Sequence, residues 1–377
     1  MSDTIAKLPE RDRAPKLEAG AHLYRRLIAV AAALFSVALL PYPIRASIID
    51  IGSPITAEGY RFTNFDYSPL TGTAVGSNVN GISNNGQVVG TTVDVNGMPT
   101  STNFSGTPPT LNQLNTGAGQ TAFGINSAGD VVGGNGTNAF FLPNGGSLLD
   151  LTAPMGAINA FGINDNGNIV GQFSSGANTP GFVLGSITSN TFTTINQPVG
   201  VTADVINAQG INNNGLVVGF YLGNDGQVHG FTANAAGLPG TINGTAVADP
   251  LIPAVAGEPG ATFVFSQILG INDNGLAVGY YGDSTTSQHG YLYNTNTGMY
   301  TFVDDPAAQF HNGVEVTQIT GISDTGEIAG FYTDAGGVAH SFIANPVPEP
   351  SSLVPACFGL GAIGLTCIRR RRKTRAA

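Results

Sequence analysis

Gly210-Ile211-Asn212-Asn213-Asn214-Gly215-Leu216-Val217-Val218-Gly219 is one of six copies of a ten-residue pattern in this 377-residue chain. The copies share glycine at the first, sixth and tenth positions, isoleucine at the second, and apolar residues at the eighth and ninth. They begin at Gly81, Gly124, Gly162, Gly210, Gly270 and Gly321. Starts that lie 38 to 60 residues apart are typical of supersecondary units that stack or form a ring.

Each copy predicts a β-hairpin. Its central turn is rich in Asn and Gly, which tolerate the positive φ angles that tight hairpins require. The last unit shows the pattern most clearly, with strands expected at 316–323, 327–334 and 338–344, and with 299–304 as the outer strand of the preceding unit. The sequence therefore favours four-stranded antiparallel units.

The two ends of the repeat region complement each other. A strand of the outer type is expected at 60–67, before the first repeat, whereas the sixth unit stops after its third strand at Ala344. Pairing these leftover pieces would close a ring and remove its exposed edges. The expected fold is an all-β, six-bladed β-propeller of four-stranded blades, closed by an N-terminal strand and flanked by terminal apolar helices. A β-solenoid is the alternative, although its coils are usually more even in length.

The charges separate the body of the chain from its ends. Of 14 Lys and Arg residues, seven lie at or before Arg45 and six at or after Arg369, so Arg61 is the only basic residue between 47 and 345. That segment holds 19 of the 24 Asp and Glu residues, for a net charge of −18. Nucleic-acid affinity depends on Lys and Arg displacing counterions, so we expect no nucleic-acid partner.

The N-terminal residues 1–46 resemble an export signal. Arg25 and Arg26 precede a 14-residue apolar run, 27–40, and Ala46 offers a small residue for cleavage. An uncleaved membrane helix or a buried core helix is the alternative, but 14 residues are short for a membrane span of about 20. The expected domains are an export signal at 1–46, a β-propeller repeat domain at 47–345 and a sorting and transmembrane tail at 346–377.

The C-terminal tail contains three features in order. Pro348-Glu349-Pro350 is followed by a 16-residue apolar segment, 353–368, which contains both cysteines, and then by the basic cluster 369–373. A helix of that length reaches about 24 Å, slightly less than a hydrocarbon core of about 30 Å, and the basic cluster would hold its far end in the cytoplasm. The body would then lie outside.

This order resembles the PEP-CTERM sorting signal of exported proteins in Gram-negative bacteria. The resemblance implies processing by an exosortase-type membrane enzyme, often alongside exopolysaccharide production. Pro348, Glu349 and Pro350 are the positions that match the signal. The resemblance implies a location at the cell surface or outside it, with the membrane as a partner through the C-terminal helix before processing. Whether the tail is removed or retained stays open.

The third strands add a second resemblance. His229-Gly230-Phe231, His289-Gly290-Tyr291 and His340-Ser341-Phe342 occupy matching places in the last three units. Together with the ten-residue pattern, they resemble the HAF-type extracellular repeats, a family without an assigned activity. Matching positions on different blades do not converge, so we expect structural histidines and predict no metal site. His311 has no identifiable Ser or Asp partner, so no catalytic triad is predicted.

The turns between paired strands bear a faint similarity to calcium loops. Only Asp165, Asp273 and Asp324 of the six equivalent positions are acidic, and the other three are Asn84, Ser127 and Asn213. Calcium loops place acids at alternate positions, so plain hairpin turns are favoured. We predict no cofactor, although so acidic a body allows weak calcium binding.

No motif in the body predicts a catalytic residue or a cofactor-binding residue. A phosphate-binding loop, an H-E-x-x-H zinc motif and a G-x-S-x-G elbow are all missing, and the adjacent Asp304 and Asp305 are interpreted as a solvated strand end. The leading hypothesis is a non-enzymatic surface or matrix protein that contacts exopolysaccharide or other surface proteins, with tyrosines such as Tyr280 and Tyr291 either exposed or packed between blades. The alternative is a carbohydrate-active hydrolase or lyase with paired carboxylates at one mouth of the ring.

Overall fold

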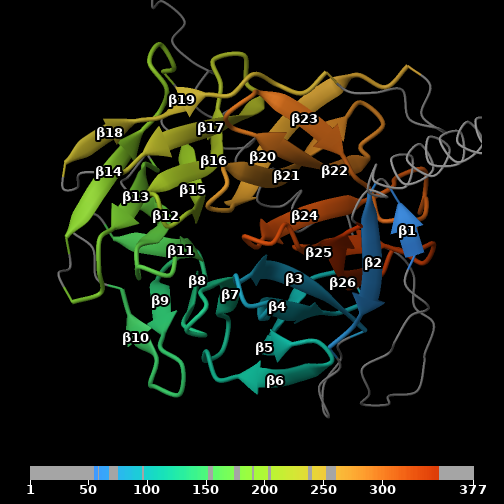
Figure 1. The fold of residues 1–377 in the computed structure, drawn as a ribbon, viewed down its shortest axis with the longest axis horizontal. Helices are drawn as coiled ribbons and strands as arrows, with labels where there is room; N and C mark the ends of the chain where they lie inside the picture. The colour runs from blue at the N-terminus through green and yellow to red at the C-terminus, as the bar shows by residue number, and fades with distance from the viewer. Residues whose placement is uncertain are drawn as a thin grey trace, which may run out of the picture.

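The computed structural model describes residues 55–347, except residues 58, 68–74, 96, 152–155, 174–178, 189–190, 203–204, 237–239 and 252–259. All regular elements in this part of the chain are β-strands, and none is a helix that could span a membrane. The strands surround a common axis, and the repeats follow one another around it (Figure 1). The expected export signal, the sorting residues and the terminal apolar helices lie outside the described residues.

The strands form five hydrogen-bonded sheets. The first contains β3 (Gly76–Ile82), β4 (Val88–Val93), β5 (Pro99–Thr107) and β6 (Thr110–Leu114). The second contains β7 (Thr121–Ile125), β8 (Val131–Gly134), β9 (Ala139–Leu142), β10 (Leu149–Asp150), β11 (Ala157–Ile163), β12 (Ile169–Phe173), β13 (Gly181–Leu184), β14 (Phe192–Asn196) and β18 (Thr241–Asn243). The third contains β15 (Ile206–Ile211), β16 (Leu216–Leu222), β17 (Val228–Asn234) and β19 (Thr245–Ala246), and the fourth β20 (Phe263–Ile271), β21 (Leu276–Asp283), β22 (Gln288–Asn294) and β23 (Met299–Phe302). The fifth contains β1 (Ile55–Ala57), β2 (Tyr60–Phe65), β24 (Thr317–Ile322), β25 (Ile328–Thr333) and β26 (Ala339–Pro346).

The expectation of six separate four-stranded blades is therefore wrong. Within the described residues there are four separate blades, three of four strands and one of five, and one nine-stranded sheet. The nine-stranded sheet joins the second and third repeats, because β11 pairs with β8 at Asn159 and Gly134. It also gains β18, which pairs parallel with the outer strand β14. The all-β propeller arrangement itself is confirmed.

The predicted closure of the ring is confirmed. Strand β2 pairs antiparallel with β26 over six residue pairs, from Tyr60 opposite Pro346 to Phe65 opposite Ser341. The blue N-terminal strand therefore lies in the same sheet as the red C-terminal strands (Figure 1). The strands expected in the last unit are found within one or two residues, since β24, β25 and β26 begin at Thr317, Ile328 and Ala339.

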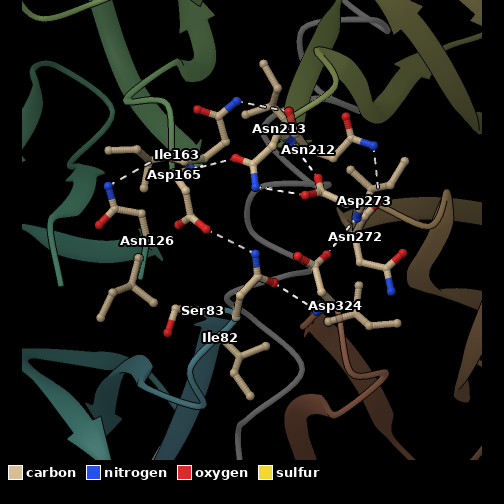
Figure 2. A pocket seen from close by; sticks show the side chains of 16 residues that line it. Ile82, Ser83, Asn126, Ile163, Asp165, Asn212, Asn213, Asn272, Asp273 and Asp324 are labelled. Carbon is tan, nitrogen blue, oxygen red and sulfur yellow. Dashed lines mark hydrogen bonds between the residues drawn. The ribbon is translucent and has the colours of Figure 1, made fainter. Parts of the chain in front are cut away.

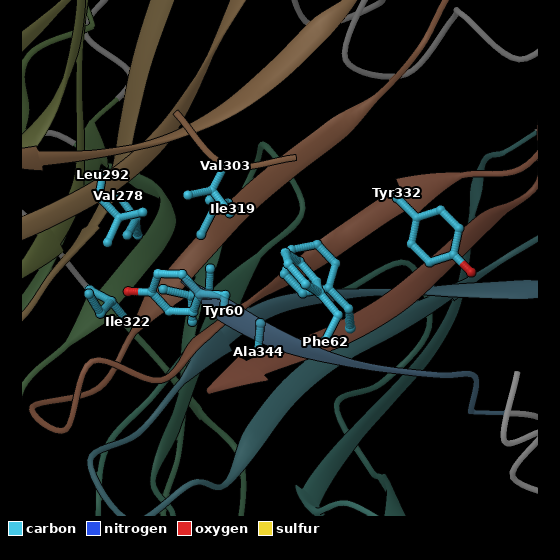
Figure 3. Close-up of a cluster of buried hydrophobic side chains, with 11 residues drawn as sticks. Tyr60, Phe62, Val278, Leu292, Val303, Ile319, Ile322, Tyr332 and Ala344 are labelled. Atoms are coloured by element: carbon cyan, nitrogen blue, oxygen red, sulfur yellow. The ribbon is translucent and has the colours of Figure 1, made fainter. Parts of the chain in front are cut away.

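The closing sheet has an apolar core of its own. Phe62 is 1% exposed, and its ring lies 5.2 Å from that of Phe342 on β26. The same buried cluster extends to the neighbouring blade, where it includes Val278 and Leu292 (Figure 3). The first and last strands are thus held by side-chain packing as well as by backbone hydrogen bonds.

The last glycine of each repeat is required because any larger residue would clash with the neighbouring strand. This glycine lies opposite the inner strand. In the fourth repeat, for example, a Cβ added to Gly219 would come within 1.9 Å of the Asn207 carbonyl oxygen. A fully buried aromatic ring of the third strand covers this strand pair in all six repeats: Phe104, Phe140, Phe182, Phe231, Tyr291 and Phe342. The x-Val-Val-Gly part of the repeat therefore leaves room for that ring.

Candidate functional site

The first glycines of the six repeats form a closed circle at the axis. An added Cβ on Gly162 would lie 2.5 Å from the Gln209 carbonyl oxygen and 3.2 Å from the Gly210 Cα. The same relation continues through the repeats and returns from Gly321 to Gly81, where the distance to the Cα is 3.3 Å. Only glycine allows the inner strands to approach so closely, and for this reason the axis is narrow.

A small polar mouth lies at one end of the axis. It is a cavity of about 50 Å³, and all six repeats line it with the isoleucine of the pattern (Figure 2). Four repeats also contribute the next two residues, whereas the second repeat adds only Asn126 and the sixth only Asp324. The six isoleucines are 5% to 8% exposed and form its apolar floor. They are Ile82, Ile125, Ile163, Ile211, Ile271 and Ile322. A second cavity, of about 70 Å³, is lined by the axial glycines and the residues just before them.

The turn residues at this mouth are joined in a circle of hydrogen bonds. In five of the six steps, the backbone N–H of one turn residue donates to the side-chain oxygen of its equivalent in the next repeat. The N···O distances are 2.7 Å from Ser127 to Asp165, 2.9 Å from Asp165 to Asn213, 2.7 Å from Asn213 to Asp273, 2.8 Å from Asp273 to Asp324 and 2.8 Å from Asp324 to Asn84. The sixth step, from Asn84 to Ser127, differs because the serine side chain is shorter. Here the side-chain amide of Asn84 donates to the carboxylate of Asp165, one repeat farther on, at 3.1 Å.

A second tier of hydrogen bonds lies just beneath this circle. The side-chain amide of Asn164 donates to the backbone oxygen of Asn212 at 2.9 Å, and Asn212 donates to Asn272 at 3.0 Å. Asn272 in turn donates to Ser323 at 3.0 Å. The Asn of the Gly-Ile-Asn pattern therefore joins one repeat to the next, a role that sequence analysis did not assign to it.

The three carboxylates at the mouth are already engaged. Burial alone would raise the pKa of Asp165, but the hydrogen bonds that Ser127 and Asn84 donate outweigh it and lower that pKa. Burial, followed by repulsion from Asp273 and Asp165, raises the pKa of Asp324 despite the N–H donated by Asp273. Across residues 55–347 as described, no group of three or more His, Cys, Asp or Glu is arranged to hold a metal ion. The arrangement thus connects the repeats to one another.

The histidines of the third strands lie far from this mouth, each between two aspartates. His229 Nδ1 lies 2.9 Å from Asp249, and its Nε2 lies 3.1 Å from Asp225. His340 lies 2.7 Å from Asp66 and 3.3 Å from Asp334. The third histidine, His289, lies 2.8 Å from Asp304 and 3.9 Å from Asp283. Each of the three histidines thus has its own pair of aspartates.

The sites of His229 and His340 supply internal cations to a body whose sequence has only one arginine and no lysine. A neutral imidazole donates from one ring nitrogen only, so two carboxylates on one ring favour the protonated form. Burial would lower the pKa of His340, but Asp334 and Asp66 outweigh it and raise that pKa to about 9. The pKa of His229 is raised in the same way by Asp249 and Asp225, against the effect of burial.

Sequence analysis missed the aspartate partners, although a signal was present. An aspartate precedes each of the three histidines by four or six residues, and it lies in the hairpin that leads to the third strand. The second partner follows an outer strand, and for His340 that partner is Asp66, which follows β2 at the other end of the chain. Asp66 thus shows that β2 takes the place of an ordinary outer strand.

We expect the free energy of unfolding to fall as pH rises, because His340 then loses the proton that its two aspartates stabilise. Its pKa in the folded protein, about 9, lies above the ordinary value of 6.5, so its contribution is complete below pH 6.5 and is lost as pH rises through 9. This rise in pKa from 6.5 to about 9 corresponds to about 3 kcal/mol. Urea denaturation from pH 6 to 9.5 should show a shallower loss for His340→Gln than for the wild type. A His311→Gln control removes a histidine that bonds to the Ala335 carbonyl oxygen and should keep the wild-type slope; an equal slope in both variants would contradict the assignment.

The structure corrects the expectation for Asp305 and decides between the two alternatives for Tyr280 and Tyr291. Asp305 is not part of a solvated strand end: it is 1% exposed, and burial raises its pKa to about 6. Asp305 lies in the turn that follows β23. The side-chain amide of Asn64 and the backbone N–H of Ala307 both donate to its Oδ1. Tyr280 and Tyr291 are 5% and 0% exposed, so both pack inside the ring rather than offering contacts to a ligand.

Comparison with known proteins identifies the tail. Residues 346–372 match the PEP-CTERM protein-sorting motif, and this confirms the resemblance on which the sorting signal was predicted. The motif implies an exported protein that is processed by an exosortase-type enzyme. A comparison with curated proteins finds no match. The motif covers a small part of the chain and gives no family for the ring.

Three of the solved structures with some likeness to this chain are as follows. A prolyl endopeptidase has 12% identity over 74% of this chain and 44% of its own, with a TM-score of 0.37. PorZ, a bacterial surface component of the type-IX secretion system of Porphyromonas gingivalis, has 10% identity over 74% and 34%, with a TM-score of 0.31. The β-propeller domain of the Trilobed protease from Pyrococcus furiosus has 8% identity over 80% and 95%, with a TM-score of 0.34. The chain spans less than half the length of the first two proteins, and the fold assignment stands on its own strand pairing.

Proposed function

We propose that this protein is a non-enzymatic scaffold or weak binding module of the cell surface or extracellular matrix, delivered through exosortase-type processing of its tail. The sorting motif at 346–372 carries the proposal. The ring supports it, because circles of hydrogen bonds and close glycine contacts make a rigid body without using a charged cluster for chemistry. Exopolysaccharide or another surface protein is the partner that this location favours, and the likeness to HAF-type extracellular repeats belongs to the same proposal.

A carbohydrate-active hydrolase or lyase is the second candidate. One observation favours it: Asp165, Asp273 and Asp324 lie together at one mouth. That cavity, of about 50 Å³, is far smaller than ligand pockets, which enclose about 300 to 1,000 Å³. The carboxylates also accept hydrogen bonds from neighbouring turns. The mouth therefore fits a structural junction better than a sugar-cleaving site.

Mass spectrometry of the mature protein from its native host tests the proposal. We expect a C-terminus that lacks the basic cluster 369–373, and a variant with Pro348→Ala, Glu349→Ala and Pro350→Ala that retains it. Val347→Ala, just outside these three residues, is the matched control and should be processed normally. An intact tail on the wild-type protein would contradict exosortase-type processing.

A further inference from the structure

The two faces of the ring are different. The turns between the first and second strands of all six repeats lie at the polar mouth, and we call this end the turn face. The strands are antiparallel, so the hairpins between second and third strands lie at the opposite end, the hairpin face. These hairpins include residues 223–227, 283–287 and 334–338.

The chain leaves the ring at the turn face. Strand β26 begins at Ala339, beside the hairpin face, and ends at Pro346. The Pro346 ring lies 3.6 Å from the position of an added Cβ on Gly326, which belongs to the turn of the sixth repeat. The next residue is also fixed, because the Val347 N–H donates to the Gly59 carbonyl oxygen at 2.7 Å. The direction of exit is thus set by the closing sheet.

Little chain separates this exit from the apolar segment of the tail. Five residues, 348–352, precede the segment 353–368. From Val347 to Leu353 the chain has six Cα-to-Cα steps, which reach no more than about 22 Å when fully extended. From Ala339, beside the hairpin face, to Val347 at the exit there are eight steps along β26, or about 26 Å. The hairpin face is therefore farther from the apolar segment than the spacer can reach.

We propose that the unprocessed protein stands with its turn face toward the membrane that holds its tail and presents its hairpin face outward. This rests on the proposed function, which places the apolar segment in a membrane before processing. The outward face then carries the groups a partner meets first. They include Phe310, 43% exposed in the loop before β24, and the half-exposed carboxylate of Asp225 beside His229.

The test is energy transfer from the ring to a short-range acceptor on lipid headgroups. The full chain, with Cys357→Ser and Cys367→Ser, is reconstituted into vesicles and labelled at one new cysteine. Thr325→Cys places the label on the turn face and Ala335→Cys on the hairpin face of the same blade, and both residues are exposed. We expect strong transfer from position 325 and weak transfer from position 335.

The possible results separate the two proposals. Equal transfer from both positions, or stronger transfer from 335, in a chain that floats with the vesicles would overturn the orientation alone. A chain that does not float with the vesicles would contradict the membrane-held state and, with it, the orientation. Denaturation midpoints of both labelled variants that match the unlabelled chain confirm that the ring remains folded during the measurement.

Discussion

Gly219→Ala is expected to destabilise the ring by about 3 kcal/mol, because the new methyl group has no space in the folded protein. Its Cβ would lie 1.9 Å from the Asn207 carbonyl oxygen and 2.7 Å from the Phe231 ring, and both are buried. Neither is the end of a flexible side chain, so the strand pair β15 and β16 would have to separate. Urea denaturation of the body should show the midpoint shift.

Gly185→Ala is the matched control for this change. The same methyl group is added there, but the nearest atom, the Thr191 carbonyl oxygen, is 4.0 Å away. We expect a change within about 0.5 kcal/mol. Equal losses in the two variants would show that the glycines of the repeat are not selected by close packing at the strand pair.

A disulfide across the closing sheet is expected to have the largest stabilising effect. Arg61 and Asn345 are opposite each other on β2 and β26, and both side chains are exposed. Such a bond would close nearly the whole ring and restrict the unfolded chain, which corresponds to about 3 to 5 kcal/mol. The body has no cysteine of its own, so Arg61→Cys with Asn345→Cys forms one defined pair once Cys357 and Cys367 are replaced by serine.

The sequence predicts the local structure of this fold. Glycine and asparagine at fixed places predict the turns, and the leftover strand at 60–67 predicts the partner of the last hairpin, because a ring leaves no free edge. The same six repeats supply the residues at the mouth. Whether Asp165, Asn213 and their equivalents form a hydrogen-bonded circle, however, depends on the angle between neighbouring repeats. That angle is a property of the closed ring and is not encoded in any single repeat.

The features that sequence analysis missed arise from contacts between distant segments. Asp305 is buried because Asn64, 241 residues earlier, lies against it in the closing sheet. The second and third repeats merge into one sheet through a single pair, Asn159 and Gly134, and β18 reaches back to the outer edge of that sheet. Neither contact has a periodic signature, so a strand pattern alone does not predict them.

The most direct measurement of the central claim, a ring closed by its first and last strands, is the mass of the Arg61→Cys and Asn345→Cys protein after mild oxidation. Closure predicts a monomer that loses two hydrogens and yields a single cross-linked peptide joining positions 61 and 345 after proteolysis. Each single variant should yield no such peptide. A double variant that stays reduced while folded, or that links only between molecules, would contradict the closed ring.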